Sequence, residues 1–301
     1  PGFCSAGEIV FLWQRGLLDG QLCGCGVPVP QCEFWSRVGK TAFGGWDQID
    51  AAEMLGLQKR ADRNRFIPAM VTPAVRPGAR SDVARYGDVL SRLYRAIGEV
   101  SGARVVIDAS KHASTAFFLT TRVPGLDVRV VHLVRDPRGV AYSWTKEVKK
   151  PEVTGEDAFM PVYSPVSSGR QWLSYNLLFE GLRALPAAKS AVFRYEDMLA
   201  DPRAELERIL AHAGEPVLPE SFAFLGERPG ASGASPEMSV TLGVDHTVAG
   251  NPMRFHQGPL ALRLDEAWKS KLPERDQRIV AAVTTPLRLR YGYTKRNSTH
   301  G

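Results

Sequence analysis

The sequence predicts an α/β fold in which helices cover both faces of a central parallel sheet. Short, almost continuously apolar segments alternate with segments whose apolar residues recur at helical spacing. Apolar strands of this kind are typical of parallel sheets that are buried on both faces. A chain of 301 residues is long enough for one large domain, and we expect a single domain over residues 1–301.

The expected elements follow from apolar spacing and from Gly and Pro positions. Strands are predicted at residues 104–108, 128–134 and 191–195. Helices are predicted at 86–100, closed by Gly102, at 172–182, from Asp201-Pro202 to Gly214, and at about 273–283. The remaining segments suggest a loop entering a short helix at 1–18, irregular structure at 20–48 and a mobile loop at 60–82.

Composition and charge narrow the class of protein. Hydrophobic residues make up 44% and charged residues 23% of the chain, which is ordinary for a soluble globular protein. The net charge of +6 suits an anionic ligand but is too weak to indicate nucleic acid. No apolar run approaches the roughly 18–20 residues that a membrane span requires, so we expect no stable membrane insertion. The richness in Ala, Arg and Val suggests a bacterial, cytoplasmic protein.

The four cysteines, Cys4, Cys23, Cys25 and Cys32, all lie near the start of the chain. A Cys-x-Cys pair differs from the Cys-x₂-Cys knuckle of common metal sites, and no His lies nearby in sequence. The spacing therefore favours free thiols or a local disulfide over a metal, and we predict no metal.

The segment that follows the strand at 128–134 carries a candidate anion site. Ligands of parallel α/β sheets bind beyond the carboxyl ends of the strands, where Arg135 stands. Asp136 and Pro137 are suited to cap and begin a helix, which places Ser143 two turns along it. A guanidinium fork and a hydroxyl can then converge on one anion, assisted by the helix dipole. An Arg–Asp surface pair with an incidental Ser remains the alternative.

Two other polar residues of this segment are expected to have no direct role in binding. His132 lies inside the predicted strand, which favours a core histidine over a catalytic one. Arg138 lies in the first turn of the predicted helix, where a solvent-facing charge is the default expectation.

The segment LVRDPRGVAYSW resembles the 3′-phosphate-binding motif of sulfotransferases that use 3′-phosphoadenosine 5′-phosphosulfate (PAPS). The resemblance implies that Arg135 and Ser143 bind the 3′-phosphate. The segment FRYEDMLADP is similar to the family's Tyr-Glu-Asp segment, which implies that Tyr195 lies near the adenine.

A second group of cofactor residues comes from HTVAGNPMRF, which resembles the C-terminal cofactor loop of carbohydrate- and bacterial-type members. The resemblance implies that Arg254 reaches the 3′-phosphate and that Gly250 and Asn251 shape the loop.

Two further segments suggest catalytic residues. In PGFCSAGEIVFLW, Glu8 matches a Gly-Glu segment whose Glu is the catalytic base in the tyrosylprotein-type branch. VVIDASKH resembles the strand that leads to an active-site Ser-Lys pair, so Lys111 or Ser110 is expected to touch the sulfuryl group or the bridging oxygen. His112 is the other candidate base, because it follows a strand end on the ligand side.

The resemblance implies a P-loop NTPase-like three-layer fold and a sulfotransferase that uses PAPS, releases adenosine 3′,5′-bisphosphate and requires no metal. The acceptor would be a hydroxyl or amine of a small molecule, glycan or lipid, and the oligomeric state stays open. The family's Gly-rich 5′-phosphosulfate loop has no match in the chain, because GKTAFGG at 39–45 neither follows a strand nor opens a helix. We expect that loop and the first strand to lie upstream of Pro1, so that residues 1–301 form an N-terminally truncated domain.

Two alternative functions remain. A P-loop kinase acting on a small molecule would have a similar sheet, but it would need a Walker-type loop and an Asp for Mg²⁺. A non-catalytic nucleotide-binding module would bind adenosine 3′,5′-bisphosphate without turnover.

Overall fold

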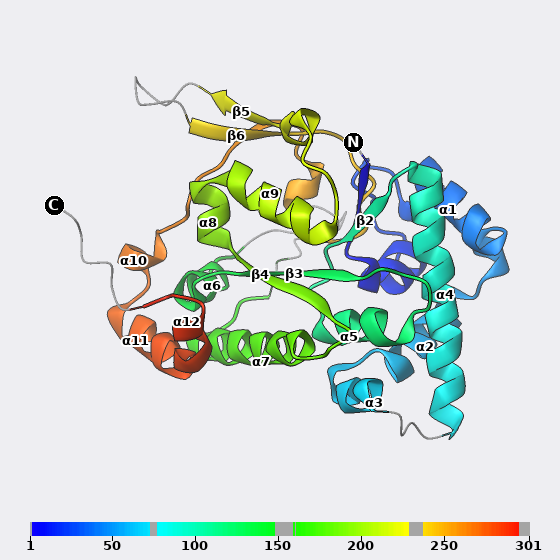
Figure 1. Ribbon diagram of the computed structural model, residues 1–301, viewed down its shortest axis with the longest axis horizontal. Coiled ribbons are helices and arrows are strands. Elements are labelled where there is room, and N and C mark those ends of the chain that lie inside the picture. Colours follow the sequence, from blue (N-terminus) through cyan, green and yellow to red (C-terminus); the bar gives the residue numbers. More distant parts are fainter. Residues whose placement is uncertain (1, 73–76, 148–158, 160, 229–236, 295–301) are drawn as a thin grey trace. The chain divides into compact units, whose positions relative to one another are not determined.

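The computed structural model describes residues 2–72, 77–147, 159, 161–228 and 237–294, which are drawn as coloured ribbon in Figure 1. The chain divides into two compact units. The first unit comprises residues 1–128, 151–154 and 241–260, and the second comprises residues 129–150, 155–240 and 261–301. Both units combine parallel strands with helices, as the predicted α/β class requires.

The first unit is built on a parallel strand pair, β1 (Phe3–Gly7) and β2 (Val105–Asp108). The long helix α4 (Pro77–Ser101) packs against both strands. The helices α1 (Glu33–Phe43), α2 (Ala51–Ala61) and α5 (Ala113–Arg122) pack against α4, and α3 (Ile67–Val71) packs against α5. Large side chains fill the core of this unit, among them Trp13, Trp35, Tyr86, Leu93 and Phe118.

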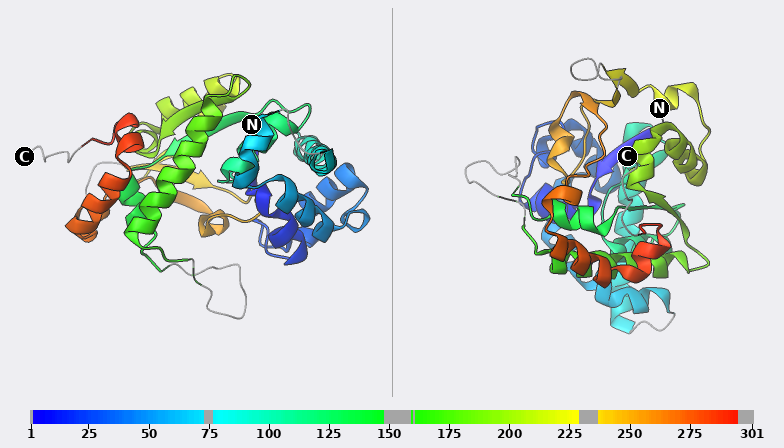
Figure 2. Two further views of the ribbon diagram at one scale, coloured as in Figure 1. Left: turned by 90° about the horizontal axis from the view of Figure 1, so that it is seen from below. Right: turned by 90° about the vertical axis from the view of Figure 1, so that its left-hand side faces the viewer.

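The second unit is built on another parallel pair, β3 (Arg129–Val134) and β4 (Lys189–Arg194). Its helices are α6 (Pro137–Ser143), α7 (Pro165–Arg183), α8 (Tyr195–Ala200), α9 (Pro202–Ala213), α10 (Trp268–Lys271), α11 (Glu274–Val283) and α12 (Thr285–Arg290). The core of this unit contains Val134, Trp172, Leu287, Tyr291 and Tyr293. Figure 2 shows α7 and α11 from two further directions.

Smaller elements complete the described chain. A third sheet has the order β5-β6-β7, formed by Leu225–Arg228, Glu237–Leu242 and Gly258–Ala261, and β5 is antiparallel to β6. Short 3₁₀ or π turns lie at Ile9–Phe11, Leu12–Leu18, Val29–Gln31, Trp46–Gln48, Asn64–Phe66, Pro219–Phe222 and Pro252–Phe255. Within the described residues, every helix is too short or too polar to cross a bilayer.

The predicted strands are confirmed to within two residues, whereas α4 begins nine residues and α7 seven residues before the predicted helices. Three loop predictions were wrong in whole or in part. Residues 1–18 contain β1, whose sequence FCSAG holds no β-branched residue and is fixed by hydrogen bonding to β2. Residues 20–48 contain α1, in which Trp35, Val38 and Ala42 are buried at helical spacing. The stretch 60–82 holds α3 and the start of α4, while its residues 73–76 lie outside the described residues.

The two faces of β3 differ in burial. His132 and Val134 are buried on one face, whereas Val131 and Leu133 on the other face are 41% and 53% exposed. Since successive side chains of a strand point to opposite faces, this exposure belongs to one whole face. The expectation that both faces are covered is therefore met on one face of β3 only.

His132 is a core histidine, as predicted. Its Nε2 lies 2.8 Å from Oδ1 of Asn176, and its ring stacks on Phe179 with the centroids 4.9 Å apart. Burial lowers the pKa of His132, and the hydrogen bond to Asn176 opposes this only in part.

This pKa shift predicts a loss of stability in weak acid. As the pH falls below about 6.5, the unfolded chain binds a proton at this position more readily than the folded chain, so the free energy of unfolding decreases. The variant His132→Gln, which keeps an N–H donor for Asn176, should show a smaller decrease between pH 7.5 and pH 5.5. Urea unfolding at the two pH values measures it, with the exposed His256→Gln as the control. An unchanged pH dependence in His132→Gln would contradict the assignment.

Candidate active site

The candidate 3′-phosphate site of the second unit begins where β3 ends. Oδ1 of Asp136 accepts a hydrogen bond from the N–H of Arg138 at 2.9 Å and so caps α6, whose first residue is Pro137. Ser143 is the last residue of α6 and is exposed. The helix start that the sequence predicted is therefore confirmed, and the Ser143 hydroxyl faces solvent.

Arg135 stands between β3 and α6 and meets Tyr195, the first residue of α8 after β4. The guanidinium carbon of Arg135 lies 4.7 Å from the centroid of the Tyr195 ring, and its Nη2 donates to the backbone O of Asp265 at 3.1 Å. A Cβ added at Gly139 would lie only 3.3 Å from Nε of Arg135, so glycine makes room for the guanidinium. Two predicted cofactor residues are thus brought together at the carboxyl ends of neighbouring parallel strands.

Glu196 ties these two strand ends together, a role that the sequence reasoning missed. Its Oε1 accepts the N–H of Asp136 at 3.0 Å, and its Oε2 accepts the hydroxyl of Tyr293 at 2.6 Å. The same hydroxyl lies 3.2 Å from the backbone O of Val134. The available signal was the acidic residue next to Tyr195, directly after a predicted strand.

Arg138 corrects the sequence prediction, because its side chain is packed and only 12% exposed. Nε and Nη2 of Arg138 donate to the carboxylate of Asp136 at 2.9 and 2.6 Å, and its guanidinium lies 4.4 Å from the centroid of the Trp268 ring. A planar guanidinium can pair with a carboxylate and stack on an aromatic face at the same time. The Arg–Asp pair considered as an alternative exists, but Arg138 makes it and not Arg135.

Asp265 holds the cations of this site. Its Oδ2 lies 3.3 Å from Nζ of Lys146 and 3.7 Å from Nη2 of Arg135. Burial favours the neutral form of Asp265, but the N–H of Ala267 and the ammonium of Lys146 outweigh it and lower the pKa of the carboxyl. Asp265 is therefore an anion at neutral pH, and it keeps two cationic side chains beside one another.

The candidate catalytic residues Glu8 and Lys111 meet in the first unit, after the ends of β1 and β2. Nζ of Lys111 forms an ion pair with Oε1 of Glu8. The Glu8 side chain is 12% exposed, whereas that of Lys111 is 73% exposed. The pair therefore joins a largely buried carboxylate to a cation that reaches it from solvent.

Gly7 and Val248 fix the backbone at Glu8. Gly7 has φ +78°, and a Cβ there would lie 2.4 Å from the backbone O of Val248. The N–H of Glu8 donates to this oxygen at 2.7 Å, and the N–H of Val248 donates to the O of Ala6 at 3.0 Å. Both contacts hold the chain close to β1 and require glycine at position 7.

Asp108, at the end of β2, positions the segment that follows Glu8, and the sequence reasoning missed it. Its Oδ1 accepts the N–H of Ser110 at 2.7 Å and that of Ile9 at 3.3 Å, and its Oδ2 accepts the hydroxyl of Tyr94 at 2.5 Å. Burial and the negative charge of Asp108 raise the pKa of Tyr94, which therefore remains a proton donor. Oγ of Ser110 also accepts the N–H of Val10 at 3.0 Å.

The other predicted residues of the first unit occupy different surroundings. His112 directly precedes α5 without a side-chain capping bond, and its ring contacts Phe11 edge-on with the centroids 5.6 Å apart. Gly250 has φ +113°, and a Cβ there would lie 3.7 Å from Oε1 of Glu8. Oδ1 of Asn251 accepts the N–H of Met253 at 3.0 Å, and the role of Gly250 and Asn251 in a cofactor loop stays a prediction.

Arg254 is held on the backbone of the first unit. Its Nη1 donates to the O of Leu22 at 2.9 Å and to the O of Thr247 at 3.0 Å, and its guanidinium lies 4.2 Å from the centroid of the Phe255 ring. Its contact with a 3′-phosphate stays a prediction.

The string at 39–45 is not a phosphate loop, as predicted. Gly39 and Lys40 lie in the last turns of α1, and Gly44 ends that helix in the left-handed region with φ +88°. A phosphate loop would instead join the end of a strand to the start of a helix.

Comparisons with known proteins bear on the family. The model of the sulfotransferase family matches residues 56–220, more than half of the chain. Two sulfotransferase domains of known structure are similar to this chain. The domain of the Synechococcus PCC 7002 olefin synthase has 16% sequence identity and a TM-score of 0.40, with 95% of this chain and 93% of that chain covered. The domain of the curacin biosynthetic pathway has 17% sequence identity and a TM-score of 0.37, with 94% of this chain and 98% of that chain covered. No curated protein matches the chain.

The assignment to a family rests on the match to the family model alone. The matched range includes Lys111 and the segment from Arg135 to Tyr195, where the motifs were found in the sequence. The chain belongs to the sulfotransferase family.

Proposed function

We propose that this protein transfers the sulfuryl group of PAPS to a hydroxyl or amine of a small-molecule, glycan or lipid acceptor and releases adenosine 3′,5′-bisphosphate. The observation that carries the proposal is the meeting of Arg135 and Tyr195 at the ends of β3 and β4, with Ser143 eight residues further along. A guanidinium beside an aromatic ring suits a nucleotide that carries both a phosphate and a base.

In the nucleotide site, Arg135 would bind the 3′-phosphate through its guanidinium fork. The exposed hydroxyl of Ser143 would add a neutral hydrogen bond, and the ring of Tyr195 would lie against the adenine. The backbone O of Arg135 accepts the indole N–H of the buried Trp172 at 3.1 Å. The residue is therefore fixed from the core side before a nucleotide arrives.

At the reacting end, Glu8 would act as the base. Its carboxylate would take the acceptor's proton as the acceptor oxygen or nitrogen bonds to sulfur, while the bond from sulfur to the bridging phosphate oxygen breaks. The negative charge develops on the leaving nucleotide, and the ammonium of Lys111, which already pairs with Glu8, would stabilise it. His112 is the alternative base, because it lies directly after Lys111.

The acceptor class and the cytoplasmic location remain proposals that rest on the family resemblance and the composition. The basic balance of the chain, +6, suits a substrate with several phosphate and sulfate charges.

A matched pair of ligands tests the proposal. Adenosine 3′,5′-bisphosphate should bind roughly tenfold to a hundredfold more tightly than adenosine 5′-monophosphate, because charged hydrogen bonds to the 3′-phosphate are worth about 1.5–3 kcal/mol. Isothermal titration calorimetry measures both affinities, and ³⁵S-labelled PAPS with a panel of hydroxyl acceptors measures turnover. Equal affinities would overturn the nucleotide assignment. A preference for ATP with Mg²⁺ would indicate a kinase, and tight bisphosphate binding without transfer would indicate a binding module.

A further inference from the structure

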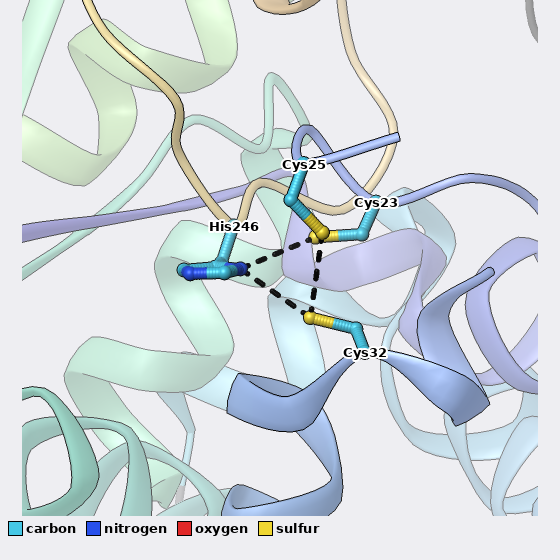
Figure 3. A group of neighbouring side chains, drawn as sticks. All are labelled: Cys23, Cys25, Cys32 and His246. Atoms are coloured by element: carbon cyan, nitrogen blue, oxygen red, sulfur yellow. Dashed lines mark hydrogen bonds between the residues drawn. The ribbon is translucent and has the colours of Figure 1, made fainter. Parts of the chain in front are cut away.

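Three of the four cysteines gather beside a histidine that is remote in sequence. Cys23, Cys25 and Cys32 lie near the start of the chain, and His246 is more than 200 residues away, but all four belong to the first unit. In Figure 3 the sulfurs of Cys23 and Cys25 overlap, and dashed lines join the sulfurs to one another and to a ring nitrogen of His246. The sequence reasoning missed the histidine because it searched only the neighbourhood of the cysteines.

Three of the six distances between donor atoms in this cluster are close to the edges of a tetrahedron around one ion. Sγ of Cys32 lies 3.7 Å from Sγ of Cys25 and 3.3 Å from Nδ1 of His246, and Sγ of Cys23 lies 3.8 Å from the same nitrogen. Bonds of about 2.3 Å to sulfur and about 2.0–2.1 Å to nitrogen in a tetrahedral zinc site place two sulfurs about 3.8 Å apart and a sulfur and a nitrogen about 3.6 Å apart. All four donor atoms lie within 4.8 Å of one another.

The backbone around the cluster holds the turn at residues 23–26 close to residues 245–247. A Cβ at Gly24 would lie 2.0 Å from Oδ1 and 3.0 Å from the backbone O of Asp245, so a side chain here would displace Asp245. The N–H of Gly24 donates to the O of Thr247 at 3.0 Å, and Gly26, with φ +85°, closes the turn by donating to the O of Cys23 at 2.8 Å. This turn presents Cys23 and Cys25 to the histidine side of the cluster.

The orientation of His246 is fixed by neighbours that do not belong to the donor set. The indole N–H of Trp35 donates to the backbone O of His246 at 2.7 Å. The ring of Phe34 stacks on the imidazole with the centroids 4.9 Å apart and an interplanar angle of 13°. Nη1 of Arg254 bonds the carbonyls of Leu22 and Thr247, which directly flank Cys23 and His246. These contacts hold the backbone and the ring of His246 beside the three cysteines.

Burial argues for a structural site. Cys23 and Cys32 are 0% and 2% exposed, so the cluster is closed on two sides by the core. Four protein donors complete a tetrahedral shell and leave no position for water, which distinguishes structural from catalytic zinc.

We propose that Cys23, Cys25, Cys32 and His246 bind one zinc ion as three thiolates and an imidazole. Zn²⁺ would form three bonds to sulfur and one to Nδ1, and the three thiol protons would pass to solvent without any oxidation or reduction. Residues 23–32 and 246 lie outside the range 56–220 that the family model matches. The inference is independent of the proposed sulfuryl transfer and would hold for a chain without that activity.

The site would also fix the segment beside Glu8. His246 is two residues before Val248, whose backbone bonds to Ala6 and Glu8, and four residues before Gly250. A zinc ion would therefore anchor residues 246–250 to the turn at 23–26 and keep that segment against the end of β1.

Metal analysis of the purified protein tests the inference without any substitution. Mass spectrometry of metals should find about one zinc per chain after gel filtration under reducing conditions. The zinc should fall to background in Cys25→Ser and His246→Ala. Cys25 is only partly buried, so its replacement perturbs packing least. Cys4→Ser is the matched control, because Cys4 lies outside the cluster and should leave the zinc content unchanged.

Cobalt gives a second readout that does not depend on how the variants fold. Co²⁺ added to metal-depleted wild-type protein should produce the visible bands of tetrahedral coordination and a near-ultraviolet sulfur-to-cobalt band, saturating at one equivalent. Added zinc should remove both. A wild-type protein that binds neither metal stoichiometrically, or one in which peptide mapping finds a Cys25–Cys32 disulfide under reducing conditions, would overturn the inference. Stoichiometric iron or copper in place of zinc would overturn the choice of metal.

Discussion

Glu8→Gln should slow sulfuryl transfer by roughly a hundredfold to ten-thousandfold, the usual contribution of a positioned general base. The amide keeps the shape of the side chain and can still accept a hydrogen bond from Lys111, but it cannot take the acceptor's proton. Binding of adenosine 3′,5′-bisphosphate should be nearly unchanged, because Glu8 is assigned to the acceptor side of the reaction. Initial rates with ³⁵S-labelled PAPS and calorimetry of the bisphosphate measure the two effects.

The control for this substitution is Glu53→Gln, which removes another ion-paired carboxylate of the same unit. Glu53 pairs with Arg85 at 2.5 Å on the surface of α2 and should leave the rate unchanged. His112→Ala distinguishes the two candidate bases. A full rate in Glu8→Gln together with a large loss in His112→Ala would move the role from Glu8 to His112.

Arg135→Ala should abolish most of the preference for adenosine 3′,5′-bisphosphate over adenosine 5′-monophosphate. The lost charged hydrogen bonds correspond to about 1.5–3 kcal/mol, or roughly tenfold to a hundredfold in affinity for the bisphosphate. The monophosphate has no 3′-phosphate, so its affinity should change little. The ratio of the two affinities, measured by calorimetry in wild type and variant, isolates the interaction between this side chain and that phosphate.

Arg278→Ala is the control for the loss of an arginine. Arg278 pairs with Glu274 at 2.9 Å on α11, in the same unit as Arg135, and its side chain is 74% exposed. This variant should keep the full ratio. If Arg135→Ala keeps it too, Arg135 does not bind the 3′-phosphate.

The local sequence predicted those strands and helices whose own residues favour the structure that they adopt. The strand at 128–134 and the helix that follows it were predictable because apolar β-branched residues, an Asp cap and Pro137 all favour the same structure. β1 was not predictable, since its five residues form a strand only through pairing with β2. The exposure of Val131 and Leu133 was not predictable either, because neighbours in space decide which face of a strand is covered.

In the candidate site, too, the residues placed by local sequence could be predicted, whereas the contacts between distant residues could not. Arg135, Ser143 and Tyr195 stand at strand ends or on the following helix, where sequence order places them near one edge. Arg138 pairs with Asp136, two positions away, whereas the partner of Arg135 is Asp265, which lies 130 positions away and could not be found from local sequence. The approach of His246 to three cysteines is a contact of the same long range, which no local spacing could indicate.

The contacts between β1 and Val248 bear on how the chain folds as it leaves the ribosome. The first unit contains β1 but gains its bonds to Val248 only when residues 241–260 have been synthesised. The core of the second unit equally requires Leu287, Tyr291 and Tyr293. The first unit can therefore reach its final packing only after residues 241–260 have been synthesised, and the second only after Tyr293 has been added.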